Sequence, residues 1–197
     1  MKKIFILIII LTAAYFFFQR TPEVRISESA KIVAFGDSLT YGYGSTEGHD
    51  YVTVLSEMIE RPIINLGVSG DTTGDALKRI DSVTKLQPGL VIVFLGGNDL
   101  LRRVDVNNTF LNLDTILKKI TENGARVILV AVPGSVFGDP YQNRFKDLAE
   151  KYDAIYVPQF LTKLVGNEEL MYDGIHPNDA GYIIVAEKIF DAVKRLI

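Results

Sequence analysis

Cysteine is absent from the 197 residues, and histidine occurs only twice, as His49 and His176. The lack of cysteine excludes disulfide bonds, thiolate metal ligands, a cysteine nucleophile and an anchor attached to a lipid-modified cysteine. A mechanism that needs an imidazole can draw only on the two histidines. The length is typical of one domain, and a domain of this size buries about 70% of its unfolded surface, so it folds without cross-links.

An excess of positive charge is also lacking. The formal net charge is −3, although residues 1–20 carry Lys2, Lys3 and Arg20 and no acidic residue. Subtracting these three positive charges leaves −6 for residues 21–197. Phosphate backbones repel a body of that sign, so we expect no nucleic-acid partner. Nothing in the sequence indicates a protein partner.

The N-terminus is unlike the rest of the chain. Lys2 and Lys3 precede residues 4–18, a run that contains no charge and no helix breaker. A charged start followed by an apolar stretch is typical of a signal peptide, with residues 12–14 (TAA) as the only plausible cleavage site. The apolar run continues beyond that site and favours an uncleaved anchor, although as a helix it reaches only about 22 Å of a ~30 Å hydrocarbon core.

We therefore predict a membrane anchor or signal peptide over residues 1–20 and a polar linker over residues 21–30. The paired lysines favour a cytoplasmic N-terminus. Either reading carries the remaining domain across the cytoplasmic membrane, to the periplasmic or extracellular side, where it is anchored or, if the segment is cleaved, secreted.

From residue 31 onward, short apolar runs alternate with segments of helical spacing. The predicted strands are residues 32–35, 63–66, 90–95, 127–132 and 155–157. The predicted helices are residues 51–60, 73–86, 109–122, 141–152 and 178–196. Continuous apolar strands alternating with amphipathic helices indicate a parallel sheet covered on both faces. Residues 31–197 are thus predicted to form one α/β domain, a three-layer α/β/α sandwich with a five-stranded, mainly parallel sheet.

Unusual polar residues follow three of the strands and precede the last helix. Ligands of such a sheet bind at the carboxyl ends of its strands, so these loops are expected to meet at one edge. They supply a hydroxyl, a glycine-rich turn, an amide and a carboxylate–imidazole pair. The four segments are residues 36–40 (GDSLT), 65–71 (NLGVSGD), 96–99 (GGND) and 173–177 (DGIHP).

These four segments resemble, in order and spacing, the signature blocks of the SGNH (GDSL) hydrolases. The resemblance covers residues 31–197 and implies a flavodoxin-like fold and a serine hydrolase that cleaves carboxylic ester or thioester bonds without a cofactor. It also implies an oxyanion hole formed by the N–H groups of Ser38 and Gly70 and by the side-chain amide of Asn98.

The same residues make chemical sense on their own. A serine hydroxyl becomes a nucleophile when a base removes its proton, and a carboxylate can hold that base in one tautomer. We therefore predict a triad of Ser38, His176 and Asp173, with no metal. Ser38 alone could be a helix N-cap. We assign no role to His49 in its loop and expect Asp37 and Asp99 to bond loop backbones.

The wider pattern resembles the bacterial thioesterase/lysophospholipase/arylesterase subgroup, in which the loop after the fourth strand borders the acyl pocket. Here that loop is residues 133–141, and Val136 and Phe137 could line an apolar pocket or pack against the sheet. The stretch between Phe160 and Asp173 is short, which would leave less of a lid over the site. The expected partner is a small-molecule ester or lipid, with chain length left open.

Three other functions share these residues. A carbohydrate O-acetyl esterase of the cell envelope would use the same triad with a different acyl pocket. A catalytically inactive envelope binding protein could have the same fold. A metal-dependent phosphoesterase would use Asp37, Asn98, Asp173 and His176 as ligands, but such sites usually contain several histidines.

Overall fold

The sheet is parallel throughout and has the spatial order β2-β1-β3-β4-β5. The structure is a computed structural model and describes residues 25–133 and 140–197. The strands are β1 (Ile32–Gly36), β2 (Ile63–Gly67), β3 (Leu90–Phe94), β4 (Arg126–Val130) and β5 (Ile155–Val157). The predicted three-layer fold is confirmed, and the strand order is that of the flavodoxin-like class.

The central strands are buried because helices cover both faces of the sheet. Every residue of β1 and β3 is buried, as expected for strands that read as continuous apolar runs. β1 lies between β2 and β3, with Ile32 opposite Ile63 on one side and Leu90 on the other. The strand order reverses beside β1, so the loop after Gly36 leaves the sheet at the point where ligands usually bind.

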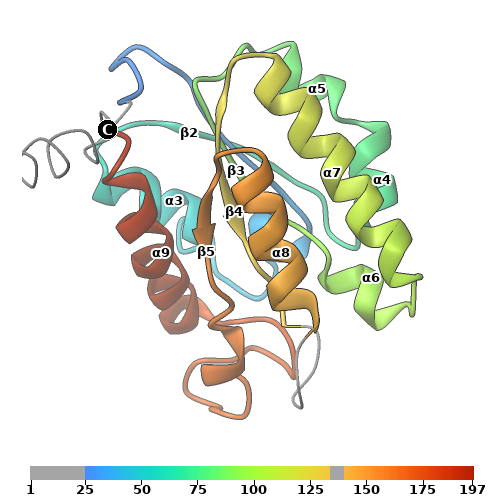
Figure 1. Cartoon of the computed structure of the whole chain (residues 1–197). Coiled ribbons are helices and arrows are strands. Elements are labelled where there is room, and N and C mark those ends of the chain that lie inside the picture. Colours follow the sequence, from blue (N-terminus) through green and yellow to red (C-terminus); the bar gives the residue numbers. More distant parts are fainter. Residues whose placement is uncertain (1–24, 134–139) are drawn as a thin grey trace, which may run out of the picture.

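Helices α3 and α9 cover one face of the sheet, and α4, α5, α7 and α8 cover the other (Figure 1). The longer helices are α3 (Tyr51–Met58), α4 (Thr73–Lys78), α7 (Val106–Glu122), α8 (Pro140–Lys151) and α9 (Asp179–Val193). The short ones are α2 (Ser38–Tyr41), α5 (Asp81–Thr84), α6 (Gly97–Leu101) and the 3₁₀ turn η1 (Leu161–Lys163).

Several element boundaries differ from the prediction. The helix expected over residues 73–86 is two helices, because the chain turns at Arg79, whose side chain bonds the ends of two strands. Helix α7 begins three residues early, at Val106, because Asp105 caps it by accepting the N–H groups of Asn107 and Asn108. Helices α2 and α6 were expected as loops. A helix of four or five residues is too short to show a period.

The described chain begins and ends at the same end of the domain. The N–H of Ile26 donates to the carbonyl of Leu196 at 2.6 Å, and Arg61 bonds the carbonyls of Ser27 and Ala30. Ile26, Ser27 and Ala30 of the expected linker therefore contact the domain. In Figure 1 the C-terminus lies at the end of the molecule away from the start of α9. The four motif loops lie at the opposite end, the carboxyl edge of the sheet.

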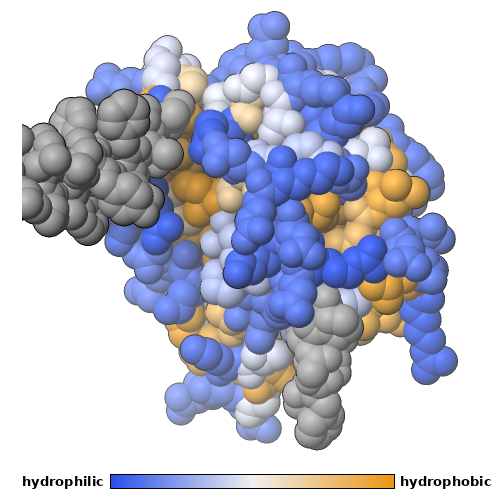
Figure 2. Space-filling model, in the orientation of Figure 1, coloured by the Kyte–Doolittle hydropathy of each residue, from blue (hydrophilic) through white to orange (hydrophobic). Residues whose placement is uncertain are grey.

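The face shown in Figure 2 is mainly hydrophilic, with smaller apolar patches between the polar residues. No helix in the described ranges is both long enough and apolar enough to cross a membrane. The predicted anchor, residues 1–20, lies outside these ranges.

Candidate active site

Ser38 is the first residue of α2, directly after the central strand. Asp37 caps the helix, with its Oδ1 accepting the N–H of Leu39 at 3.1 Å. The helix ends at Gly42, whose φ of 90° suits glycine. Gly36 has no room for a side chain, because a Cβ there would overlap Thr40 and the carbonyl of Phe94. Ser38 is thus a helix residue held at a tight turn, and its hydroxyl lies at the sheet edge.

His176 and Asp173 lie in one turn before α9. The Oδ1 of Asp173 accepts the N–H groups of Ile175 and His176, both at 2.8 Å, and these bonds fix the turn. The Oδ2 of Asp173 lies 2.8 Å from Nδ1 of His176. The Nε2 of His176 lies 3.0 Å from Oγ of Ser38. The structure therefore brings the three residues of the predicted triad into one hydrogen-bonded chain.

The charge on Asp173 determines which way these bonds run. Burial by itself would raise the pKa of Asp173, but the His176 ring and two backbone N–H groups lower it overall. An ionised carboxylate only accepts hydrogen bonds, so Nδ1 of His176 carries the ring proton. The Nε2 atom then has a free lone pair and accepts the hydroxyl proton of Ser38.

The three predicted oxyanion donors come from the start of α2 (Ser38), the loop after β2 (Gly70) and α6 (Asn98). Gly70 has a φ of 86°, and its carbonyl accepts a bond from Arg102 at 2.7 Å. Within the described ranges, neither the N–H of Ser38 nor that of Gly70 has an acceptor. The Nδ2 of Asn98 donates to the carbonyl of Asp71 at 3.0 Å and lies 3.4 Å from Oδ2 of Asp37.

Two buried carboxyl groups support these loops. Burial raises the pKa of Asp37 to about 7, although the N–H of Leu39 lowers it in part. Asp99 accepts the backbone N–H of Thr73 at 2.8 Å and its hydroxyl at 2.6 Å, which joins α6 to the start of α4. Both contacts agree with the structural role expected for these aspartates.

An apolar cavity of about 190 Å³ opens beside the triad. Ser38, Asn98 and His176 are among the residues that line it. Its apolar lining includes Leu100, Leu101, Val132, Leu161, Val165 and Ile175. Val136 and Phe137, which were expected either to line an apolar pocket or to pack against the sheet, lie outside the described residues. The apolar pair directly after the GGND segment could have indicated Leu100 and Leu101.

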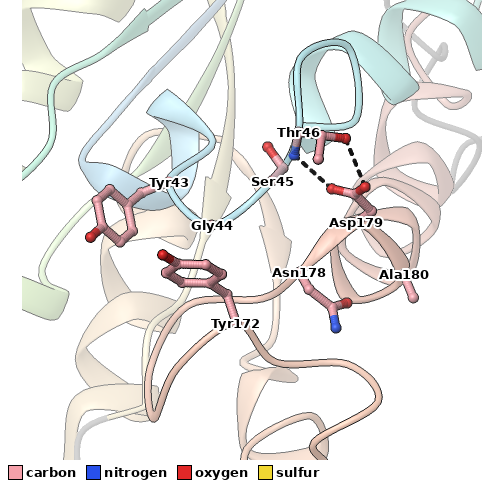
Figure 3. A pocket seen from close by; sticks show the side chains of 8 residues that line it. All are labelled: Tyr43, Gly44, Ser45, Thr46, Tyr172, Asn178, Asp179 and Ala180. Carbon is pink, nitrogen blue, oxygen red and sulfur yellow. Dashed lines mark hydrogen bonds between the residues drawn. The ribbon is translucent and has the colours of Figure 1, made fainter.

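A second, open recess of about 580 Å³ lies between residues 43–46 and the segments that contain Tyr172 and residues 178–180 (Figure 3). The ring of Tyr43 lies 4.6 Å from the His176 ring and meets Tyr172 edge-on. Figure 3 shows the backbone N–H and hydroxyl of Thr46 bonding the carboxylate of Asp179, at 2.7 and 2.8 Å. These bonds tie the loop after α2 to the start of α9.

The other histidine lies apart from this constellation. His49 is exposed, and its Nδ1 contacts the hydroxyl of Thr46 and the carbonyl of Glu47. In the described ranges, no group of three or more histidine, aspartate or glutamate side chains is arranged to hold a metal ion. His176 is thus the imidazole that meets a hydroxyl and a carboxylate, the arrangement of a serine hydrolase.

Comparison with known proteins gives the same class. The model of the GDSL-like lipase/acylhydrolase family matches residues 34–184. An arylesterase of Vibrio mimicus is 30% identical over 181 residues, which cover 85% of this chain and 90% of that protein. Thioesterase 1/protease 1/lysophospholipase L1 of Escherichia coli (strain K12) is 26% identical, with 88% of each chain covered.

Solved structures of esterases have the same fold. The psychrotrophic esterase EstA of Pseudoalteromonas sp. superposes with a TM-score of 0.76 at 26% identity, over 85% of this chain and 98% of EstA. The SGNH-hydrolase family esterase AlinE4 gives a TM-score of 0.67 at 38% identity, over 86% of this chain and 97% of AlinE4. The chain belongs to the GDSL-like lipase/acylhydrolase family, and it is an ester hydrolase.

Proposed function

We propose that this protein cleaves carboxylic ester or thioester bonds through an acyl-enzyme formed on Ser38. The observation that carries the proposal is the hydrogen-bonded chain from Oγ of Ser38 through the His176 ring to Asp173, with links of 3.0 and 2.8 Å. Such a chain lets a neutral hydroxyl act as a nucleophile near neutral pH.

Each residue has one task in the reaction. Oγ of Ser38 attacks the acyl carbon while Nε2 of His176 takes the hydroxyl proton. The tetrahedral intermediate then collapses, and His176 passes that proton to the departing alcohol or thiol. Water repeats the two steps on the acyl-enzyme and releases the acid. Asp173 holds the ring in its tautomer and stabilises the imidazolium that forms.

The negative oxygen of the intermediate is bound by hydrogen-bond donors near Oγ of Ser38. The N–H groups of Ser38 and Gly70 are available for it. The contact between Asn98 and Asp37 is 3.4 Å, longer than an ordinary hydrogen bond of 2.7–3.2 Å. The N–H of Asn98 that points to Asp37 is therefore able to donate to a substrate oxygen instead. The other N–H stays bonded to the carbonyl of Asp71, which keeps the amide in place.

The acyl group occupies the apolar cavity beside Ser38. Leu101, Val165 and Ile175 line this cavity and are about half exposed, so an apolar chain would cover surface that is otherwise wet. Burying apolar area contributes about 25 cal/mol per Å², which favours acyl groups longer than acetyl. This supports a lipid or longer-chain ester more than an acetylated glycan.

The test uses the full chain with p-nitrophenyl esters from acetate to palmitate. We expect hydrolysis that survives a chelator, disappears in Ser38→Ala and is faster for a longer chain than for acetate. Loss of activity in the chelator would indicate a metal mechanism. Full activity in Ser38→Ala would refute the acyl-enzyme. A profile that peaks at acetate would favour the carbohydrate O-acetyl esterase, and the absence of any hydrolysis would favour the inactive binding protein.

We further propose that residues 1–20 hold the domain on the outer side of the cytoplasmic membrane. Two lysines before an uncharged apolar run support this location. The contact between Ile26 and Leu196 places the start of the described chain opposite the site. The four residues 21–24, between this segment and the described chain, span at most about 14 Å. An anchored domain would thus face its active site away from its own membrane. Protease added to spheroplasts, whose cytoplasmic membrane is intact, should digest the domain; protection until that membrane is lysed would refute the location.

A further inference from the structure

Arg79 directly follows α4, and its guanidinium binds three different segments. Its Nε donates to Oδ2 of Asp71 at 2.6 Å, its Nη1 to the carbonyl of Leu66 at 2.8 Å, and its Nη2 to the carbonyl of Gly36 at 2.9 Å. The plane lies over the Phe35 ring, 4.4 Å from its centre. The side chain is only 23% exposed, so these bonds are largely shielded from water.

The three acceptors lie where the oxyanion donors leave the sheet. Gly36 ends β1 and is two residues before Ser38. Leu66 is the penultimate residue of β2, ahead of the loop that carries Gly70. Asp71 directly follows Gly70, and its carbonyl accepts the side-chain amide of Asn98. The Arg79 guanidinium is therefore bonded to the backbone next to the segments that carry the N–H groups of Ser38 and Gly70. Through Asp71 it is also linked to the side-chain amide of Asn98.

We propose that Arg79 is a positioning residue of the oxyanion hole, which sets the spacing of the Ser38 and Gly70 N–H groups and the Asn98 amide. The inference rests on the proposed function of Ser38. The guanidinium suits this task because its donors form a rigid fork, whereas a lysine offers one flexible point charge. A misplacement of about 1 Å in such donors can cost about 100-fold in rate.

The effect is one of geometry. The carboxylate of Asp71 neutralises the charge of Arg79 at 2.6 Å, so little net charge reaches the substrate oxygen. Loss of Arg79 should therefore weaken binding of the transition state and leave binding of the ground state nearly unchanged. A residue that only stabilised the fold would lower the melting temperature without this selective effect.

The experiment compares Arg79→Gln and Arg79→Lys with Arg126→Gln in the full chain. Arg126 is a matched control because its side chain is 29% exposed and pairs with Asp153 at 2.7 Å, at the amino end of β4. The measurements are kcat and KM on a p-nitrophenyl ester, inhibition by an alkyl trifluoromethyl ketone, and melting temperature. The ketone forms a covalent adduct with a serine and places a negative oxygen in the oxyanion hole, so it reports on that hole directly.

For Arg79→Gln we expect kcat to fall about 10- to 100-fold, KM to change less than about threefold, and ketone binding to weaken by the same factor as kcat. Arg79→Lys should lie between wild type and Arg79→Gln. Arg126→Gln should keep kcat within about twofold of the wild-type value, even if its melting temperature falls as much as that of Arg79→Gln.

A folded Arg79→Gln with wild-type kcat and ketone binding would overturn the inference, and so would a rise in KM alone. If Arg79→Gln does not fold, Arg79→Lys and Asp71→Asn decide by the same criteria, because both keep a side chain of similar size. Ser38→Ala separates the two hypotheses. Activity in Ser38→Ala would refute the proposed function, whereas its loss together with an unaffected Arg79→Gln would refute this inference alone.

Discussion

Charged side chains are more deeply buried at the carboxyl edge of the sheet than at its amino edge. At the carboxyl edge, Asp37 is 2% exposed, and the Asp71–Arg79 pair leaves 13% and 23% of its side chains exposed. At the amino edge, Arg126 pairs with Asp153, whose side chain is 87% exposed. Both pairs are short, so the difference lies in burial and in what else the side chains bond.

The buried charged groups therefore lie at the edge of the sheet that carries the proposed active site. Taking a carboxylate out of water costs free energy unless it is paired and hydrogen-bonded. At the amino edge of the same sheet, Asp153 pairs with Arg126 while staying exposed to water, so this pair buries no carboxylate. The buried polar groups of the carboxyl edge join α2, the Gly70 loop and α6, which are the segments that carry the proposed donors.

Among the substitutions that test this difference between the two edges, replacing His176 should lower kcat the most. His176→Ala removes the base, and we expect kcat to fall at least about 10⁴-fold, to a weak residual rate supported by the remaining donors. His49→Ala is the matched control, because it removes the other histidine from an exposed loop, and its kcat should stay at the wild-type value. Steady-state kinetics on a p-nitrophenyl ester measures both. More than a few per cent of activity in His176→Ala would contradict the triad.

Asn98→Ala should have the next largest effect. Removal of one oxyanion donor is expected to lower kcat about 10²- to 10³-fold with little change in KM. The exposed Asn107 in the first turn of α7 provides the control, since Asn107→Ala changes an asparagine outside the cavity. Rates at saturating ester measure the change. A rise in KM with kcat unchanged would count against the oxyanion role.

Much of this arrangement could be predicted from the sequence. The strands are apolar runs, and those of β1 and β3 stand out because both of their faces are buried. Ser38 and His176 could be predicted because each lies in a short segment of unusual residues next to a strand or helix. These signals are local, so a single sequence is enough to show them.

The support of the site could not be predicted in the same way. Arg79 lies inside a segment with helical spacing, and nothing local shows that its side chain turns back to the carbonyls of Gly36 and Leu66. Leu161 and Val165 line the cavity although they are more than 120 residues from Ser38. Such contacts depend on how loops pack at the sheet edge, which periodicity does not describe.

Asp37→Asn should change how stability depends on pH. The folded pKa of Asp37 is about 7, raised by burial from 3.8. Between these values the folded state keeps a proton that the unfolded state has lost, so this group's contribution to stability falls as pH rises from about 4 to 7 and is constant above.

At about 1.4 kcal/mol per pKa unit, Asp37 should therefore destabilise the protein by up to about 3 kcal/mol between pH 5 and pH 8. Asparagine does not titrate, so urea unfolding of Asp37→Asn at the two pH values should show a smaller difference than wild type. Asp105→Asn is the control for exchanging an N-cap aspartate, since it caps α7 on the surface. Parallel pH curves for wild type and Asp37→Asn would contradict the buried, protonated carboxyl.

Asp153→Asn should have the smallest effect, and it tests the amino edge. Asp153 has a φ of 49°, and asparagine tolerates this left-handed conformation, so the exchange removes the charge without new backbone strain. An ion pair this exposed contributes at most about 1 kcal/mol, so urea unfolding should show a small loss and kcat should not change. Asp71→Asn is its counterpart at the carboxyl edge and should lower kcat, because it weakens the hold of Arg79 on the Gly70 loop. An equal loss of kcat in both variants would mean that the two edges do not differ in function, and that the buried pair acts only through the stability of the fold.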